Sequence, residues 1–333
     1  MMKLAIVILN WNGEQMLRQF LPKVLATAQT VEANVYVVDN ASTDQSLSYL
    51  TTIPEINTIA LDANYGFAEG YNRGLKEIDA TYYLLLNSDV EVTDNWLSPL
   101  LQYMEQHPEV AACQPKIKSF FNRSYFEHAG ACGGFIDWYG YPFCRGRVLH
   151  HVEQDRGQYD STASLFWASG AALFIRAADY WQVGGLDERF FAHMEEIDLC
   201  WRLRSRNRSI VCVPQSVVYH MGGGTLPTTS YRKVYLNFRN NLLMLYKNLP
   251  EKDLRPILTV RFFLDYIAAF QFLLKGQFSF AKAVWQARSA YKKMRPLYQE
   301  IRSENLRQTI LKDVPERRTY SILWRYLWRK KMV

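Results

Sequence analysis

The segment HMEEIDLCWR, residues 193–202, places three carboxylates within four positions and follows them directly with apolar residues. The three acids are Glu195, Glu196 and Asp198. On a helix, residues three apart share a face, so Glu195 and Asp198 point the same way and Glu196 points elsewhere. A carboxylate held beside a core can remove a proton from a hydroxyl group as a general base. An acidic first turn, favoured by the helix dipole, is the structural alternative for the cluster.

Four further groups of polar residues stand at the ends of predicted strands. Four apolar runs alternate with helical patterns over the first 120 residues, and they read LAIVIL, VYVVD, NTIAL and YYLLL. Apolar strands separated by helices are typical of a parallel sheet covered on both faces, which is a doubly wound α/β architecture. Ligands of such sheets bind beyond the carboxyl ends of the strands. The residues that follow the four strands are Asn10-Trp11-Asn12-Gly13, Asp39-Asn40-Ala41-Ser42, Asn64-Tyr65-Gly66-Phe67 and Asn87-Ser88-Asp89.

Each of these groups alone is compatible with ordinary turn chemistry, because Asn, Asp, Gly and Ser serve any strand-to-helix connection. Four groups that converge on one sheet edge favour a binding site instead. The segment NYGFAEGYNRG, residues 64–74, lacks the G-x-G-x-x-G spacing of dinucleotide-binding proteins and follows the third strand, not the first. A nicotinamide cofactor is therefore not expected.

The charge of the chain is divided unevenly. Of its 333 residues, 49% are hydrophobic and 14% aromatic, which is enough for a large core and excludes disorder as the main state. Residues 251–333 hold 18 Lys and Arg against 7 Asp and Glu, a net charge of +11. Residues 1–250 hold 21 against 25, a net charge of −4. A mildly acidic body with a basic tail is not expected to bind nucleic acid. We therefore divide the chain into a main domain, 1–250, and a helical, basic and aromatic appendage, 251–333.

The cysteines and the N-terminus predict a cytoplasmic location. The five cysteines are odd in number and widely spaced, with no C-x-x-C pair, so neither a disulfide framework nor a zinc ribbon is expected. The N-terminal apolar run covers only residues 4–9 and lacks a small-residue cleavage pattern. It is interpreted as a buried strand and not as a signal peptide.

The appendage contains one long apolar segment, residues 257–274. It is short for a membrane span and carries Arg261 and Asp265, each of which costs roughly 2.5–3.5 kcal/mol at a bilayer centre. We favour a helix in the plane of the membrane, because the cations and aromatic residues of the C-terminal ILWRYLWRKK suit an anionic lipid surface. The prediction is a peripheral protein on the inner face of the cell membrane. The alternative is an appendage packed on the main domain or on a second subunit, as in a homodimer.

Seven sequence blocks in fixed order carry a resemblance to a known family. They are VILNWNG, VVDNASTD, NYGFAEGYNRG, LLLNSDVEV, ASGAALFIR, GGLDERFFAHMEEIDLCWRLR and VYHMGGGT, within about residues 3–226. The chain resembles the inverting glycosyltransferases of family 2, and within them the bacterial rhamnosyltransferase-like branch. The resemblance implies a GT-A fold with a doubly wound mixed sheet. It also implies transfer of a sugar from a dTDP- or UDP-linked donor, with rhamnose as a candidate, to a lipid-linked or polysaccharide acceptor in cell-envelope glycan synthesis.

The resemblance assigns a divalent metal, Mg²⁺ or Mn²⁺, which neutralises the departing diphosphate. The family supplies its ligands from an Asp-x-Asp triplet after the fourth strand, and here the triplet is Asn87-Ser88-Asp89. Asp89 is the expected ligand, and Asn87 is expected to hold the ribose or a metal-bound water. His220 is expected to meet the metal from the opposite side, with backbone amides of MGGGT, residues 221–225, near the phosphates. A core or capping role is the alternative for a lone His at a strand end.

The donor side is assigned in the same way. Asp39 is expected to accept a hydrogen bond from the ring N–H of uracil or thymine, or else to cap the next helix. Trp11 is expected to stack on the base, or else to pack beneath the sheet edge. Arg73 is expected to reach the diphosphate, or else to be a solvated surface residue. The remaining donor-binding candidates are Asn10, Asn12, Asn64 and Gly66.

On the acceptor side, the resemblance gives Glu196 the position of the catalytic base and Glu195 the position before it. Asp198 and Arg202 at i,i+4 are interpreted as an ion pair that orients the helix. The aromatic and glycine-rich segment 119–147 is a candidate acceptor or lid loop, or else a patch folded under the sheet. A catalytically idle sugar-nucleotide-binding or scaffold protein of the same fold is the alternative function. The joint presence of Asp89, Glu196 and His220 favours the enzyme.

Overall fold

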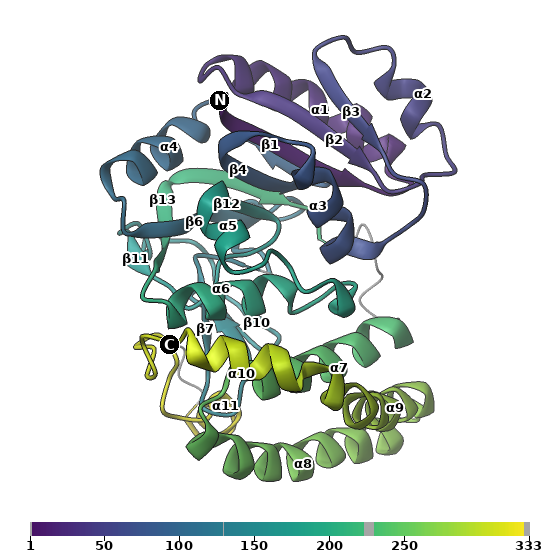
Figure 1. Ribbon diagram of the computed structural model, residues 1–333, viewed down its shortest axis with the longest axis vertical. Coiled ribbons are helices and arrows are strands. Elements are labelled where there is room, and N and C mark those ends of the chain that lie inside the picture. Colours follow the sequence, from purple (N-terminus) through teal and green to yellow (C-terminus); the bar gives the residue numbers. More distant parts are fainter. Residues whose placement is uncertain (1, 129, 223–229, 330–333) are drawn as a thin grey trace.

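The computed structural model describes residues 2–128, 130–222 and 230–329 of the chain. Figure 1 shows a strand-rich half at the top, which contains the N-terminus, and a layer of helices below it, which contains the C-terminal residues. The site candidates of the sequence lie on elements of the strand-rich half and on α6 at its junction with the helical layer.

A nine-stranded sheet forms the centre of the strand-rich half, in the order β11-β13-β6-β12-β4-β1-β2-β3, with β5 paired to β13. Strands β1 to β4 pair in parallel, as the sequence predicts, whereas β12 runs antiparallel between β4 and β6. The sheet is therefore mixed, and the predicted fold class is confirmed. Its strands are β1 (Met2–Asn10), β2 (Asn34–Asp39), β3 (Ile56–Ala60), β4 (Ala80–Asn87), β5 (Val90–Val92), β6 (Val110–Ser119), β11 (Ala163–Ser164), β12 (Ala172–Arg176) and β13 (Ser209–His220).

Helices cover both faces of this sheet, because its central strands are apolar on both sides. Successive side chains of a strand point to opposite faces. Leu4, Ile6 and Ile8 of β1 pack in one core cluster with α1 and α4, while Ala5 and Val7 pack in another with α3, α5 and α6. The helices of this half are α1 (Glu14–Gln29), α2 (Ser46–Leu50), α3 (Gly66–Lys76), α4 (Leu97–Gln106), α5 (Ala177–Gln182) and α6 (Glu195–Ser205), with a 3-10 turn, η1 (Glu188–Phe190).

The aromatic segment after β6 folds into a second, four-stranded sheet in the order β10-β9-β8-β7. Phe126, Phe135 and Phe143 are buried there, whereas Phe121 and Tyr125 are exposed. Burial favours packing for the first three rings, and a role in acceptor binding stays a prediction for the segment as a whole. The strands are β7 (Gly134–Ile136), β8 (Pro142–Cys144), β9 (Arg147–Val148) and β10 (His151–Val152).

The C-terminal region is helical, as predicted, and it packs closely on the rest of the protein. Arg302 donates to the backbone oxygen of Leu249 at 2.7 Å, and the backbone N–H of Ile310 donates to Ser205 at 2.8 Å. Tyr298 and Ile322 belong to the same core cluster as β1 and α6. The division at residue 250 stays a proposal, and in the structure residues from both parts share one core cluster. The helices are α7 (Tyr231–Asn248), α8 (Glu251–Leu274), α9 (Phe278–Met294), η2 (Arg295–Tyr298), α10 (Gln299–Arg307) and α11 (Ile322–Arg329).

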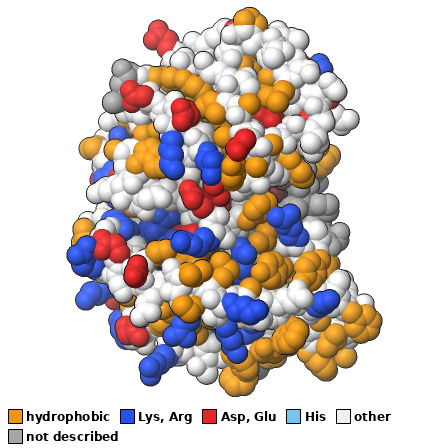
Figure 2. All heavy atoms as spheres, turned by 45° about the vertical axis from the view of Figure 1, so that its right-hand side comes forward, with side chains coloured by type: hydrophobic (Ala, Val, Ile, Leu, Met, Phe, Trp, Pro, Cys, Tyr) orange, Lys and Arg blue, Asp and Glu red, His pale blue; other side chains and the backbone are white. Residues whose placement is uncertain are grey.

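Helix α8 is the one helix of the described residues that is long and apolar enough to cross a membrane by length and composition. In the structure it packs against α9 at the lower end of the molecule (Figure 1). Figure 2 shows hydrophobic side chains gathered at that end.

Candidate active site

The sheet itself brings Asp89 and His220 together. Strand β5 begins directly after Asp89 and pairs antiparallel with the end of β13, so that Val90 lies opposite His220. The backbone N–H of Met221 also donates to the backbone oxygen of Asp89 at 3.1 Å. As a result His220 Nε2 lies 3.1 Å from Asp89 Oδ1 and 3.4 Å from Asn87 Nδ2. Asp89 and His220, which are 131 residues apart, form one buried polar pair.

A second carboxylate stands on the other side of the imidazole. Glu127 Oε2 lies 3.6 Å from His220 Nδ1, and both side chains are buried. Burial lowers the pKa of His220, but the hydrogen bond to Asp89 and the nearby carboxylate of Glu127 outweigh it and raise the pKa to about 10. Sequence reasoning missed Glu127, because nothing in the surrounding FEHAG distinguishes it from a surface acid.

The side chains at this point fit a divalent cation only if the donor substrate completes its shell. No group of three or more His, Cys, Asp or Glu side chains in residues 2–128, 130–222 and 230–329 could hold a metal ion alone. Asp89 and His220 offer one carboxylate and one imidazole. Mg²⁺ in phosphate-transfer sites is bound by one or two carboxylates together with phosphate oxygens and water. The expected amides of Gly223, Gly224 and Thr225 lie outside the described residues.

The turn that precedes α6 is held in an unusual backbone conformation. Phe191, His193 and Met194 have φ angles of 66°, 70° and 74°, a region that costs non-glycine residues free energy. The Asn240 side chain donates to the backbone oxygens of Phe190, Ala192 and His193, at 2.7–2.9 Å. These contacts fix where α6 starts and therefore where its first two acids point.

Glu195 and Glu196 occupy the first turn of α6, and their environments differ. Glu195 is 4% exposed, whereas Glu196 is half-buried. Burial raises the pKa of Glu196 to about 7, and burial together with the charge of Glu196 raises the pKa of Glu195 well above its usual value. The Oε2 atom of each is buried and has no hydrogen-bond partner within the described part of the chain. A half-buried carboxylate with a pKa near neutrality suits a general base that a hydroxyl group can reach.

A turn that contains Gly170 lies beside both Asn87 and Glu196. The backbone N–H of Asn87 donates to the backbone oxygen of Ala171 at 3.0 Å. A Cβ atom added to Gly170 would lie 3.9 Å from Cβ of Glu196 and 3.3 Å from the Phe67 ring. Both Asn87 and Glu196 therefore border the turn at residues 169–171. The fold thus gathers Asn87, Asp89, His220 and Glu196 at one end of the sheet.

Asp198 has a different role from its two neighbours. It is fully buried and accepts from Arg202 Nε at 3.0 Å, from Lys247 Nζ at 2.8 Å and from Asn248 Nδ2 at 2.8 Å. Burial raises its pKa, but Lys247 and Arg202 outweigh burial and hold the pKa below its usual value. The predicted ion pair with Arg202 is confirmed. Because its oxygens are occupied, Asp198 anchors α6 to α7, which does not favour the catalytic role for which it was also a candidate.

The donor-side candidates after β1 and β2 bind one another. Asn10 Nδ2 donates to Asp39 Oδ2 at 2.9 Å, and Asp39 Oδ1 accepts from the backbone N–H of Ser42 at 2.8 Å. Asn12 Oδ1 accepts from the backbone N–H of Thr43 at 2.7 Å. Asp39 has no exposed surface, so a contact with a nucleobase stays a prediction that requires this loop to open.

The loops after β2 and β3 are joined in the same manner. Asn40 Nδ2 donates to Asn64 Oδ1 at 3.1 Å and to the backbone oxygen of Gly66 at 3.0 Å. Gly66 has a φ of 76°, and a Cβ atom there would lie 2.5 Å from the Phe191 ring, so only glycine fits. Trp11 is 44% exposed beside these loops, which leaves its ring free to stack on a base.

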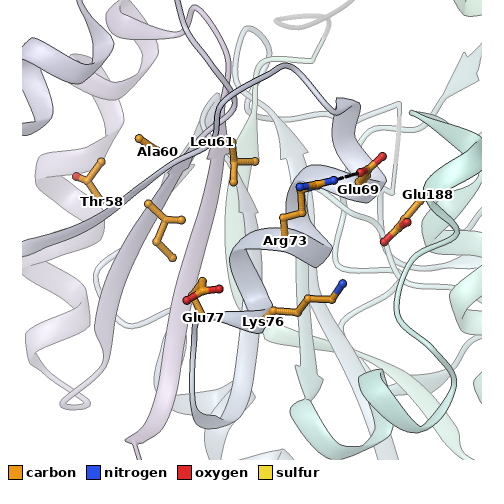
Figure 3. Close-up of a pocket in the computed structure, with 9 residues that line it drawn as sticks. Thr58, Ala60, Leu61, Glu69, Arg73, Lys76, Glu77 and Glu188 are labelled. Atoms are coloured by element: carbon orange, nitrogen blue, oxygen red, sulfur yellow. Dashed lines mark hydrogen bonds and ion pairs between the residues drawn. The ribbon is translucent and has the colours of Figure 1, made fainter.

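Arg73 lies in a surface hollow of about 640 Å³ between β3 and α3, which none of the other candidates lines (Figure 3). Its guanidinium pairs with Glu69 at 2.7 Å and stacks on the Tyr65 ring at 3.6 Å. This position favours the surface alternative for Arg73, and its contact with a diphosphate stays a prediction. The hollow is lined by Thr58, Ile59, Ala60, Leu61, Glu69, Arg73, Lys76, Glu77 and Glu188.

Comparison with known proteins assigns the family. A sequence model described as "Glycosyl transferase family 2" matches residues 5–177, about half of the chain. The N-acetylglucosaminyl-diphospho-decaprenol L-rhamnosyltransferase of Mycobacterium tuberculosis is 27% identical over 234 residues, which are 65% of this chain and 75% of that protein. The O-antigen biosynthesis protein RfbC of Myxococcus xanthus is 25% identical over 246 residues. That match covers 71% of this chain but only 19% of RfbC, so the chain spans a fifth of that relative's length.

The fold is that of solved glycosyltransferases. The crystal structure of Staphylococcus aureus TarS 1–349 in complex with UDP-GlcNAc superimposes with a TM-score of 0.56 at 17% identity. The match covers 92% of this chain and 89% of the TarS 1–349 chain. The resemblance to the GT-A glycosyltransferases is confirmed.

Proposed function

Because the chain belongs to glycosyl transferase family 2, we propose that it transfers a sugar from a nucleoside-diphosphate donor to a lipid-linked or polysaccharide acceptor, with inversion at the anomeric carbon. The observation that carries this proposal is the buried Asp89–His220 pair beside the half-buried Glu196. The Asp89–His220 pair suits a diphosphate with its cation, and Glu196 suits an attacking hydroxyl group.

Asp89 and His220 would hold a Mg²⁺ or Mn²⁺ ion together with the donor phosphates. When bound, such an ion neutralises the negative charge that develops on the departing diphosphate. The carboxylates of Asp89 and Glu127 raise the pKa of His220 to about 10, and His220 would have to be neutral to serve as a ligand. Asn87, whose Nδ2 lies 3.4 Å from His220 Nε2, would orient the ribose or a metal-bound water.

Glu196 would receive the proton of the acceptor hydroxyl as the new glycosidic bond forms. Its pKa of about 7 means that a substantial fraction is ionised at neutral pH, and its side chain is half-buried and not fully enclosed. Asn240 and Asp198 keep the base in position by fixing the start of α6 and its packing on α7.

The relatives support a place in cell-envelope glycan synthesis. The name of the Mycobacterium tuberculosis relative includes a rhamnosyl donor group and a diphospholipid-linked acceptor, and that of the Myxococcus xanthus relative includes O-antigen biosynthesis. We therefore propose a dTDP- or UDP-linked donor, with rhamnose tested first, and a cytoplasmic enzyme at the inner face of the cell membrane.

The test is release of nucleoside diphosphate from a panel of dTDP- and UDP-sugars, with a short-chain diphospholipid acceptor and with Mg²⁺, Mn²⁺ or excess chelator. We expect one donor to give release that requires the metal and is stimulated by acceptor. Asp89→Ala should lose most of the activity, whereas the matched control Asp94→Ala, an exposed acid five residues away, should keep it. Full activity in excess chelator would contradict the metal role. Donor binding without release under any condition would instead favour an idle sugar-nucleotide-binding protein.

A further inference from the structure

The middle of helix α8 has a charged pair on its buried face and large apolar side chains on its exposed face. Arg261 is 1% exposed and Asp265 is fully buried, on the face that packs against the protein. Phe263, Ile267 and Phe270 on the other face are 60%, 53% and 58% exposed. In a helix that serves only to cover a water-soluble core the pattern is the reverse.

The buried polar face is fastened by a network that ties α8 to the rest of the protein. Arg261 Nη1 donates to the backbone oxygen of Tyr139 at 2.9 Å and also to the Asn241 side chain. Asp265 accepts from Arg261 Nε at 3.2 Å and from Arg288 Nη1 of α9 at 2.5 Å. Because these charges are paired with one another and with α7, α9 and the 137–141 turn, α8 cannot rotate or leave without unpairing them.

The outer faces of α8 and α9 form one apolar surface, which Figure 2 shows at the lower end of the molecule. Nine of the sixteen large hydrophobic side chains that are exposed in the described parts of the chain lie here, within 24 residues. Such a concentration marks an interaction site. We call it the α8–α9 face, and it consists of Phe262, Phe263, Tyr266, Ile267, Phe270, Leu273, Leu274, Phe278 and Trp285.

The exposed charges around this face all have one sign. Between residues 254 and 299 the sequence holds a single acid, Asp265, and that acid is buried. The exposed charged residues of the same stretch are Arg255, Lys275, Lys282, Lys292, Lys293 and Arg295. An apolar surface with cations alone around it is complementary to a lipid bilayer with anionic headgroups.

We propose that the α8–α9 face is the membrane-docking surface of the protein. The two helices lie in the plane of an anionic membrane, with their aromatic and aliphatic side chains among the acyl chains and their cations at the headgroups. The inference deepens the proposed function, because it names the surface by which the enzyme meets a membrane that carries its acceptor. Only the statement that the membrane carries the acceptor depends on the proposed function; the docking surface itself does not.

Two other arrangements of the same surface fit less well. A membrane-spanning α8 would have to carry Arg261 and Asp265 into the bilayer and break their bonds to Tyr139, Asn241 and Arg288. A second copy of the chain docked face to face would bring two sets of cations together without a single exposed acid between them.

Flotation of the full-length protein with vesicles tests the proposal without any enzymatic assay. We expect the protein to float with vesicles that contain phosphatidylglycerol at low salt, and salt to release only part of it. Phe263→Asp combined with Phe270→Asp should lower the vesicle-bound fraction about tenfold or more, since both rings are exposed and their loss leaves the core intact. The matched control Ile310→Asp changes a side chain that is 72% exposed outside the face, and it should float like the wild type.

The contribution of the lysines to membrane binding is tested separately. Lys275→Glu combined with Lys282→Glu should weaken binding to anionic vesicles by at least roughly fivefold for each lysine and leave binding to neutral vesicles unchanged. Lys312→Glu, an exposed lysine outside the face, is the control. The proposal is overturned if the wild type stays at the bottom of the gradient at low salt, or if the double Phe variant floats normally. It is also overturned if sedimentation shows a dimer that the Phe variant dissociates, because the occupant is then a second copy.

A soluble acceptor separates this inference from the proposed function. The double Phe variant should transfer sugar to a water-soluble acceptor at the wild-type rate and to an acceptor in vesicles much more slowly. Wild-type flotation without any transferase activity would leave the docking surface standing and reject the function. Transfer to both acceptors at equal rates by the Phe variant would reject the docking surface and leave the function standing.

Discussion

The pH dependence of the reaction should report the ionisation of Glu196. Burial raises the pKa of this residue to about 7, so about half of the molecules carry the ionised base at pH 7. The base must be ionised to accept a proton, and kcat/KM should therefore rise with pH and level off above about pH 8. At pH 6 about one tenth of the base is ionised, and at pH 5 about one hundredth, so the rate should fall about tenfold per unit.

The variants for this prediction differ by one position on the same helix. Glu196→Gln keeps the shape of the side chain but cannot accept the proton, and we expect kcat to fall by about 10²–10⁴-fold with donor binding retained. Glu195→Gln is the matched control, because Glu195 is only 4% exposed whereas Glu196 is half-buried. The assay is acceptor-dependent release of nucleoside diphosphate at constant ionic strength from pH 5 to pH 9.

Two results would refute this reasoning. A flat profile from pH 5 to pH 8 would mean that no group with a pKa near 7 limits the reaction. A nearly wild-type Glu196→Gln together with an inactive Glu195→Gln or Asp198→Asn would place the base elsewhere in the cluster.

Three further predictions concern the residues around the site. Asp198→Asn should lower the free energy of unfolding by about 3 kcal/mol, because it removes the buried carboxylate that Arg202 and Lys247 share, whereas Glu304→Gln, in an exposed ion pair, should change little in the same urea titration. Glu127→Gln should weaken Mn²⁺ binding about 10–100-fold, because the Glu127 carboxylate orients the His220 ring. Calorimetry in the presence of nucleoside diphosphate measures this affinity, and an unchanged value would show that Glu127 serves only in packing. Trp11→Ala should raise the KM for donor with little change in kcat, and an unchanged KM would show that its ring does not contact the base.

The sequence predicts the strands of the main sheet well, because their apolar runs and the polar residues after them are local signals. The end of β4 at Asn87 and the end of β2 at Asp39 lie where the pattern indicates. The antiparallel position of β12 between β4 and β6 could not be derived from periodicity, since a strand pattern does not state its partner or its direction. The mixed sheet was predicted from the resemblance.

In the candidate site, too, the sequence predicts contacts between residues that are close along the chain, but not contacts between distant residues. The Asp198–Arg202 pair is one helical turn apart, and its spacing predicts it. The additional partners Lys247 and Asn248 lie about 50 residues away and Glu127 lies 93 residues before His220, so only the folded chain joins them. The orientation of α8 is a further example. Its sequence shows that Arg261 and Asp265 are costly in a bilayer, but the partners that bury them come from three other segments.

The central claim is that Asp89 and His220 bind the cation of the donor diphosphate at the end of the sheet that also holds Glu196. The most direct measurement is anomalous diffraction from crystals grown with Mn²⁺ and a nucleoside diphosphate. We predict one manganese peak within coordinating distance of Asp89 Oδ1 and His220 Nε2, with phosphate oxygens completing its shell, and no such peak in Asp89→Ala crystals. A nucleotide bound at the ends of β1 and β2 with its manganese away from Asp89 and His220, or with no manganese at all, would contradict the claim.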